Sequence, residues 1–171
     1  MGSQSLAQEE AEALRRGVLA VAELMAVSAK TAPKARGVDN VVVKILSSRE
    51  DLERLARKME ELADEYGEFF RRDARSVRDS DAVVLVGCKI VEMGLKGEKR
   101  FGMSADLVNC LVNLGIAIGS AVKTASLLNV DNRVMYSAGM AALEAGMIDA
   151  FVAYGIPLSA RAKNIYFDRR A

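Results

Sequence analysis

Residues 82–90, AVVLVGCKI, form a nearly continuous apolar run of strand length. A short run without polar alternation is typical of a central strand that is covered on both faces of its sheet. VVVKIL at 41–46 is also β-branched, and DAFVAYGIP at 149–157 is a third apolar run of similar length. The sequence therefore predicts a sheet that contains at least these three strands.

Segments with helical periodicity separate and flank these runs. The expected helices cover 6–29, 47–66, 106–130 and 131–145, whereas 69–81 has no clean period and is a loop or a short helix. Ser47 and Glu50 have the spacing of a capping box, and Asp131 or Asn132 is the expected cap of the fourth helix. Helices interspersed with few strands predict one α+β domain over residues 1–171, a small central sheet covered by helices.

The helix expected at 106–130, DLVNCLVNLGIAIGSAVKTASLLNV, is apolar around most of its circumference. Such a helix is buried in a core or in an interface. Gly115 and Gly119 lie at helical spacing and allow another backbone to approach closely, at a cost of about 1 kcal/mol each relative to alanine. We therefore expect a homodimer whose interface includes the helix around Leu111–Leu128.

Composition excludes several classes of protein. The net charge of +1 and the absence of tryptophan do not favour nucleic-acid binding. The longest apolar stretch, LVNLGIAIGSAV at 111–122, is interrupted by Asn113 and is shorter than the roughly 20 residues that span a bilayer, so no membrane segment is expected. The first residues, MGSQSLAQEEAEALRR, are acidic where a secretory leader would be basic, so the expected location is the cytoplasm.

Histidine is absent, and cysteine occurs only at Cys88 and Cys110. Triads that need a histidine base are excluded, so acid–base chemistry would fall to Asp, Glu, Lys, Tyr or a cofactor. Two cysteines cannot supply a four-thiolate iron–sulfur cluster or zinc site within one chain. We expect no metal, and the two thiols are most simply small buried apolar groups.

A basic loop, AKTAPKARGVDNV at 29–41, joins the first helix to the first strand. Pro33 is expected to end the helix, and Lys30, Lys34 and Arg36 surround it. Two interpretations stay open: a solvated basic loop, or an anion site in which lysine and arginine bind phosphate oxygens and Gly37 lets the ligand approach the backbone.

Four blocks together carry a resemblance: AKTAPKARGVDN, RRDARSVRDSDAVVLVG, LGIAIGSAV followed by DNRVMYSAGMAA, and YGIPLSARAKNIYFDR. They resemble a prokaryotic family of uncharacterised proteins described as containing a ferredoxin domain. Usual members hold a cysteine-rich stretch between the strand matching AVVLVG and the helix matching LGIAIGSAV. Here that interval holds only Cys88 and Cys110. The chain resembles a member without the cluster segment, and no iron–sulfur cluster is expected.

The order of elements also resembles the flavin-dependent nitroreductases, whose long central helix builds a dimer. In those proteins an Ala-Pro-Ser loop and basic residues near the C-terminus contact the flavin phosphate and ring edge. The resemblance implies that Lys34, Arg36 and Gly37 form one cationic pocket with Arg161 and Lys163. FMN or another phosphorylated small molecule is the implied ligand.

The expected function is that of a redox protein in which a bound flavin would perform the reaction. No catalytic residue is assigned. The alternative is a non-catalytic homodimeric binding or accessory protein. A cluster-dependent redox partner is the third class, and the number of cysteines argues against it. The sequence leaves open whether the protein is an enzyme.

Overall fold

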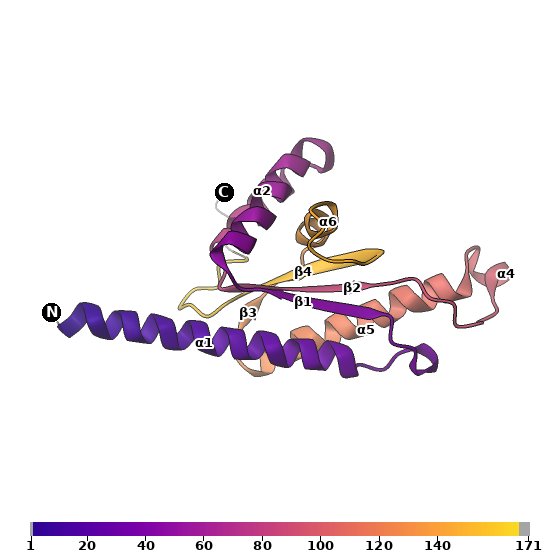
Figure 1. Ribbon diagram of the computed structural model, residues 1–171, viewed down its shortest axis with the longest axis horizontal. Helices are drawn as coiled ribbons and strands as arrows, with labels where there is room; N and C mark the ends of the chain where they lie inside the picture. Colours follow the sequence, from indigo (N-terminus) through magenta and orange to yellow (C-terminus); the bar gives the residue numbers. More distant parts are fainter. Residues whose placement is uncertain (1, 168–171) are drawn as a thin grey trace.

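The computed structural model describes residues 2–167, with side chains from Leu6 onward (Figure 1). In chain order its elements are α1 (Gly2–Thr31), the 3-10 helix η1 (Ala35–Gly37), β1 (Val41–Leu46), α2 (Arg49–Tyr66), α3 (Phe69–Arg78), β2 (Ala82–Cys88), α4 (Glu98–Phe101), α5 (Ala105–Leu127), β3 (Asp131–Asn132), α6 (Tyr136–Glu144) and β4 (Val152–Ser159). The predicted α+β class is confirmed.

The described strands pair antiparallel in the order β1-β2-β4-β3. Along β1 and β2, Val41 lies opposite Cys88 and Leu46 lies opposite Val83, so the loop before β1 is next to the end of β2. β3 is a strand that the sequence did not predict. Asp131 belongs to it and pairs with Ser159, so neither Asp131 nor Asn132 caps a helix, and α6 begins later, at Tyr136.

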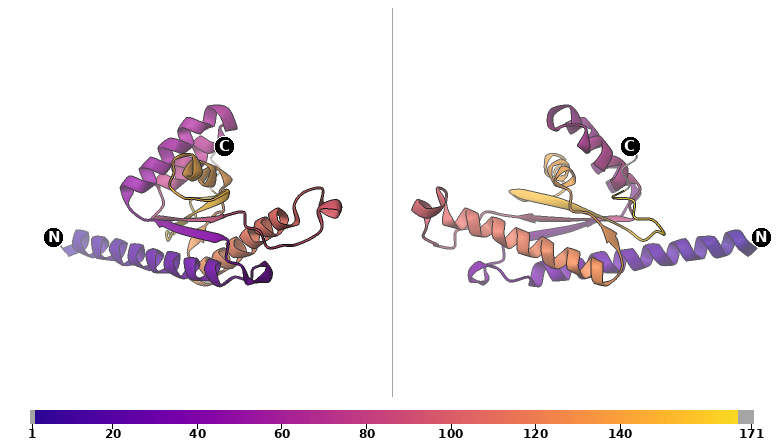
Figure 2. Two further views of the ribbon diagram at one scale, coloured as in Figure 1. Left: turned by 45° about the vertical axis from the view of Figure 1, so that its right-hand side comes forward. Right: turned by 180° about the vertical axis from the view of Figure 1, so that it is seen from behind.

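Helices cover both faces of the sheet. Figures 1 and 2 show α1 and α5 on one face and α2 and α6 on the other, where α3 packs as well. Alternate side chains of β2 enter the two cores: Leu85 packs with α2, α3 and α6, and Val84 packs with α1 and α5. Every residue of β2 is buried, which confirms the central strand that its apolar run predicts.

The structure corrects one local expectation and decides between the alternatives of another. The cap of α2 is Ser48, whose Oγ accepts a hydrogen bond from the Asp51 amide at 3.0 Å, so the capping box placed at Ser47 is wrong by one residue. The carbonyl of Ser47 instead accepts a hydrogen bond from Arg15 at 2.8 Å. Of the two alternatives expected at 69–81, a loop or a short helix, the short helix forms: it is α3, whose Phe70, Ala74 and Val77 are buried against the core.

Close backbone approach occurs at glycines other than those in α5. A Cβ on Gly139 would lie 1.9 Å from the Ala153 carbonyl oxygen, and one on Gly155 would lie 2.6 Å from the Ala138 Cβ. These glycines let α6 pack directly on β4. A Cβ on Gly115 or Gly119 would meet nothing within 4 Å, so these two glycines do not serve packing within the chain.

α5 packs one face on the sheet and on α1, and exposes the other. Cys110, Leu114 and Ala117 are buried, whereas Val112 and Ile116 are exposed on the outer face. Within the described residues, α5 is the one helix whose length and composition alone would suffice to cross a membrane, a test that core helices of folded domains also pass.

Candidate functional site

The basic loop turns sharply through two left-handed residues. Arg36 has φ +54° and Gly37 has φ +68°, and the Gly37 and Val38 amides donate to the carbonyls of Lys34 and Ala35. A left-handed conformation costs a residue with a Cβ roughly 1 kcal/mol or more. The Arg36 side chain donates from Nη1 to the Met93 carbonyl, so this contact helps to hold the strained turn in place.

Lys34 caps the C-terminal end of α1. Its Nζ donates to the carbonyl oxygens of Lys30 at 2.5 Å and Ala32 at 2.9 Å. The last carbonyls of a helix have no partner within the helix and carry the negative end of its dipole, so a lysine there is stabilising. The sequence missed this role, although a lysine shortly after a helix-ending proline was a usable signal.

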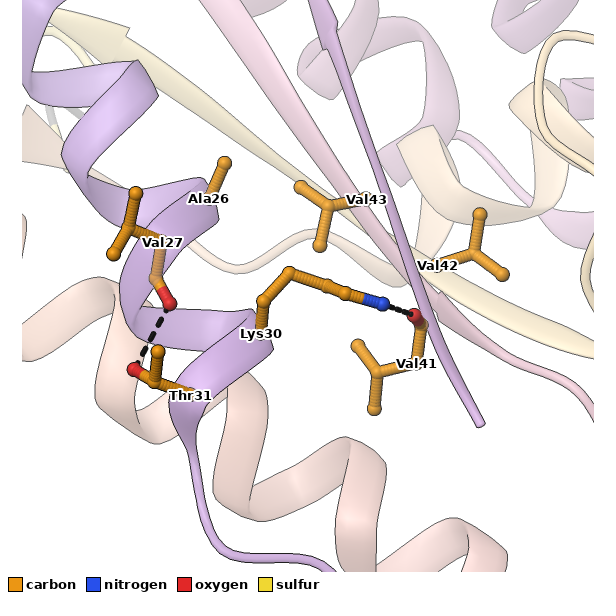
Figure 3. Close-up of a pocket in the computed structure, with 7 residues that line it drawn as sticks. All are labelled: Ala26, Val27, Lys30, Thr31, Val41, Val42 and Val43. Carbon is orange, nitrogen blue, oxygen red and sulfur yellow. Dashed lines mark hydrogen bonds between the residues drawn. The ribbon is translucent and has the colours of Figure 1, made fainter. Parts of the chain in front are cut away.

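Lys30 ties the end of α1 to the start of β1. It pairs with Asp39 and donates to the Val41 carbonyl at 2.8 Å, and Figure 3 shows this second bond across an open groove of about 570 Å³ between α1 and β1. The hydrogen bond from Lys30 is the main reason that the pKa of Asp39 lies below its usual range. Valines of β1 and Val27 of α1 line most of this groove.

A buried amide pair attaches the loop to α5. Asn113 accepts from the Ala35 amide and donates from Nδ2 to Asn40 Oδ1, both at 2.9 Å. Asn40 in turn donates to the Lys89 carbonyl at 3.0 Å. Both asparagines are buried, so each of these bonds satisfies a polar group that water does not reach. The sequence showed Asn113 only as an interruption of an apolar run.

The segment between β2 and α5, where the family resemblance places the cysteine-rich stretch, is held by hydrogen bonds. The Asp106 carboxylate accepts from the Leu95 amide at 3.0 Å and from the Gly94 amide at 3.2 Å. The bond from Leu95 is the main reason that the pKa of Asp106 is lowered. Together with the bond from Arg36 to Met93, these contacts fold the segment against the loop and α5.

Both cysteines are buried and reduced, with Cys88 in β2 and Cys110 in α5. Burial raises the pKa of the Cys88 thiol, and the neighbouring Cys110 adds to this effect. A raised thiol pKa disfavours the thiolate that nucleophilic chemistry and metal binding require. Within residues 2–167 no cluster of three or more Cys, Asp or Glu side chains is arranged to hold a metal ion.

The basic residues after β4 lie at the other end of the sheet from the loop. Arg161 donates to the Asp79 carbonyl at 3.0 Å and lies 3.8 Å from the Asp81 carboxylate, beside the start of β2. The loop lies beside the end of β2, about six strand residues or roughly 20 Å away. Lys163 follows Arg161 by two residues. One chain therefore brings Lys34, Arg36 and Gly37 together but does not bring them to the tail.

The rest of the described tail folds over the face covered by α2, α3 and α6. The Tyr166 hydroxyl and the Ser80 hydroxyl form a hydrogen bond of 3.0 Å, and burial raises the pKa of Tyr166 to about 12. Arg133 donates to the Tyr166 carbonyl at 2.9 Å and stacks its guanidinium on the Phe167 ring. The tail is therefore packed on its own chain as far as Phe167.

The sequence is similar to proteins of one family. Residues 107–169 match the model of a family described as "uncharacterized protein containing a ferredoxin domain". An uncharacterized protein of Archaeoglobus fulgidus is 41% identical over 175 aligned positions, which cover 90% of this chain and 92% of the relative. The chain belongs to this family.

Solved structures similar to this family member have the nitroreductase fold. A nitroreductase family protein from Clostridium novyi superposes with a TM-score of 0.60 at 15% identity, over 85% of this chain and 77% of that protein. A BluB-like flavoprotein from Clostridium difficile gives 0.57 at 16% identity, over 88% and 84%. The hypothetical oxidoreductase YcnD of Bacillus subtilis gives 0.57 at 15% identity, over 84% of this chain, which spans only 58% of YcnD. The likeness confirms the nitroreductase-like fold that the order of elements predicted.

Proposed function

We propose that the protein is a flavin-binding redox protein that acts as a homodimer. The observation that carries the proposal is the likeness of most of the chain to nitroreductase-fold structures, one of which is described as a flavoprotein. A bound flavin supplies hydride and electron transfer, which suits a chain that has no histidine. The chain would contribute binding, orientation and electrostatics.

The cations of the chain fit a phosphate if two chains share the site. Lysine and arginine donate charge-assisted hydrogen bonds to phosphate oxygens. Arg36 and Arg161 each have five N–H groups and donate to the Met93 and Asp79 carbonyls, respectively, so further N–H groups are available for a ligand. The loop and the tail lie at opposite ends of one sheet, so a flavin held by both needs the loop of one chain and the tail of another. In this site Lys34, Arg36 and Gly37 come from one protomer, and Arg161 and Lys163 come from its partner.

The exposed outer face of α5 supports the dimer. Val112 is 50% exposed and Ile116 is 41% exposed, and the adjacent glycines Gly115 and Gly119 meet nothing within their own chain. Apolar side chains beside open glycines form a surface that another helix can approach closely. The resemblance to nitroreductases implies the same role for this helix.

The test is the visible absorption spectrum of the purified protein before and after incubation with FMN and removal of the excess. Absorption bands of flavin in the blue, with an intensity that corresponds to a constant ratio of bound flavin to protein chains, agree with the proposal. A protein that shows no flavin bands and binds no FMN in titration calorimetry contradicts it.

The second candidate is a non-catalytic homodimer that binds an anionic metabolite or another protein. One observation favours a protein partner over a flavin phosphate: Lys30, Lys34 and Arg36 already have oxygen partners within their own chain. A dimer without flavin that binds inorganic phosphate or a phosphorylated metabolite would support this candidate.

A further inference from the structure

Two segments project beyond the sheet at opposite ends of the molecule. The first half of α1 extends past one end and α4 lies beyond the other, as Figures 1 and 2 both show. We call residues 6–14 the N-terminal arm and residues 96–101 the basic tip. Every residue of the arm is exposed, and from Leu6 onward the first buried residue of α1 is Val18.

Both segments expose large apolar side chains within a single chain. Leu6 is 67% exposed and Leu14 is 49% exposed in the arm, and Phe101 is 48% exposed in the tip. Helical turns without a tertiary partner are marginal in water, because most helical stability in proteins comes from packing an apolar face. The exposed Leu6, Leu14 and Phe101 side chains are therefore apolar surface whose burial would stabilise the two segments.

The two segments carry opposite charge. The arm holds Glu9, Glu10 and Glu12 within one turn of helix, and the tip holds Lys96, Lys99 and Arg100 around the single carboxylate of Glu98. In the same helix Arg15 donates to the Ser47 carbonyl and Arg16 pairs with Glu12, and residues 9–16 together keep a net charge of −1, from three glutamates and two arginines.

A dimer with a twofold axis perpendicular to α1 and α5 would bring these opposite charges together. α1 and α5 lie side by side on one face of the sheet, where the Ser28 and Thr124 hydroxyls are 2.6 Å apart. A twofold axis perpendicular to their length exchanges the two ends of the molecule, so an arm meets a tip twice in one dimer. We infer that each N-terminal arm docks on the basic tip of a second copy of this chain. The inference rests on the dimer of the proposed function and names the segments that the two copies exchange.

Charge reversal tests the contact. Glu9→Lys/Glu10→Lys/Glu12→Lys reverses the arm, and Lys96→Glu/Lys99→Glu/Arg100→Glu reverses the tip. Each triple variant should raise the dimer dissociation constant roughly tenfold or more at low ionic strength, measured by sedimentation equilibrium, because like charges then face each other. Mixing the two variants should form heterodimers with an affinity within about threefold of the wild type, since both contacts are then complementary.

The matched control is Glu61→Lys/Glu65→Lys on α2, which covers the opposite face and should leave the dissociation constant unchanged. Far-ultraviolet circular dichroism spectra of all variants should match that of the wild type, because the substituted side chains are exposed and their loss leaves the fold of each chain intact. Dimers that resist reversal of either segment, or variants that do not recover on mixing, overturn the inference and leave the flavin proposal intact. A wild-type monomer at micromolar concentration overturns both the inference and the proposed dimer.

Discussion

Arg36 has a strained backbone conformation and a charged side chain. Substitutions by alanine and by glycine separate the effect of the backbone on stability from the effect of the charge on binding. Its φ of +54° suits glycine, and its guanidinium donates to the Met93 carbonyl. If the loop binds the phosphate of FMN, Arg36→Ala should weaken binding by roughly 1.5–3 kcal/mol, the contribution of a hydrogen bond to a charged group. Titration calorimetry with FMN measures this loss.

Arg36→Gly is the matched control for the backbone. It should lose the same binding free energy but be more stable than Arg36→Ala by about 1 kcal/mol, because glycine adopts this conformation without a Cβ clash. Urea unfolding of the two variants gives the difference. Unchanged affinity in both variants would show that the arginine is structural only.

Asn113 is the buried residue on which the position of the loop depends. Asn113→Ala leaves the Ala35 amide and Asn40 Oδ1 without this partner, and each buried group that loses its partner costs about 1–3 kcal/mol. We expect a loss of roughly 2–4 kcal/mol in the free energy of unfolding from urea titration. Asn109→Ala, one turn earlier on α5, removes only a bond to the carbonyl of Ala105 and should cost less than about 1 kcal/mol. Equal losses in the two variants would refute the role of the amide pair.

At the scale of elements, the contact between α6 and β4 depends on glycine. Gly139→Ala would place a Cβ 1.9 Å from the Ala153 carbonyl oxygen, so the helix must move away from the strand. We expect a destabilisation of at least about 3 kcal/mol, as for severe overpacking of a core. Gly17→Ala, in the exposed part of α1, meets nothing and should stabilise the protein by up to about 1 kcal/mol. A Gly139→Ala variant that melts with the wild type would contradict this packing.

Elements with a strong local pattern were predictable, and those defined by distant partners were not. The apolar runs of β1 and β2 and the periodicity of α1 and α5 appear in the sequence itself. β3 has only two residues, both polar, and exists because it pairs with β4. The Asn113–Asn40 bond joins positions 73 residues apart, so no local pattern announces it.

The candidate site was predictable as residue types but not as an arrangement. The sequence identified the cations of the loop and of the tail, and both groups turn out to include a cap for carbonyls at a helix end: Lys34 for α1 and Arg161 for α3. Their separation follows from the register of the sheet, because β1 and β2 place the loop and the tail at opposite ends. The antiparallel pairing of β4 with β2 places the tail at the start of β2, and the sequence left this pairing open.

At the scale of the whole molecule, the account requires two chains for each flavin site. In the proposed site the loop of one protomer would supply Arg36, and the tail of the partner would supply Arg161. Neither Arg36→Ala nor Arg161→Ala alone should retain tight FMN binding, because in a homodimer of either variant both sites lack one of these cations.

Subunit exchange between the two variants tests whether two chains share the site. Subunits of Arg36→Ala and Arg161→Ala are exchanged, and the number of tight FMN sites is counted by fluorescence titration. Each mixed dimer combines one intact loop with one intact tail, so random exchange should restore about a quarter of the wild-type sites. No recovery after complete exchange, while the wild type binds FMN, would contradict a site shared between two chains.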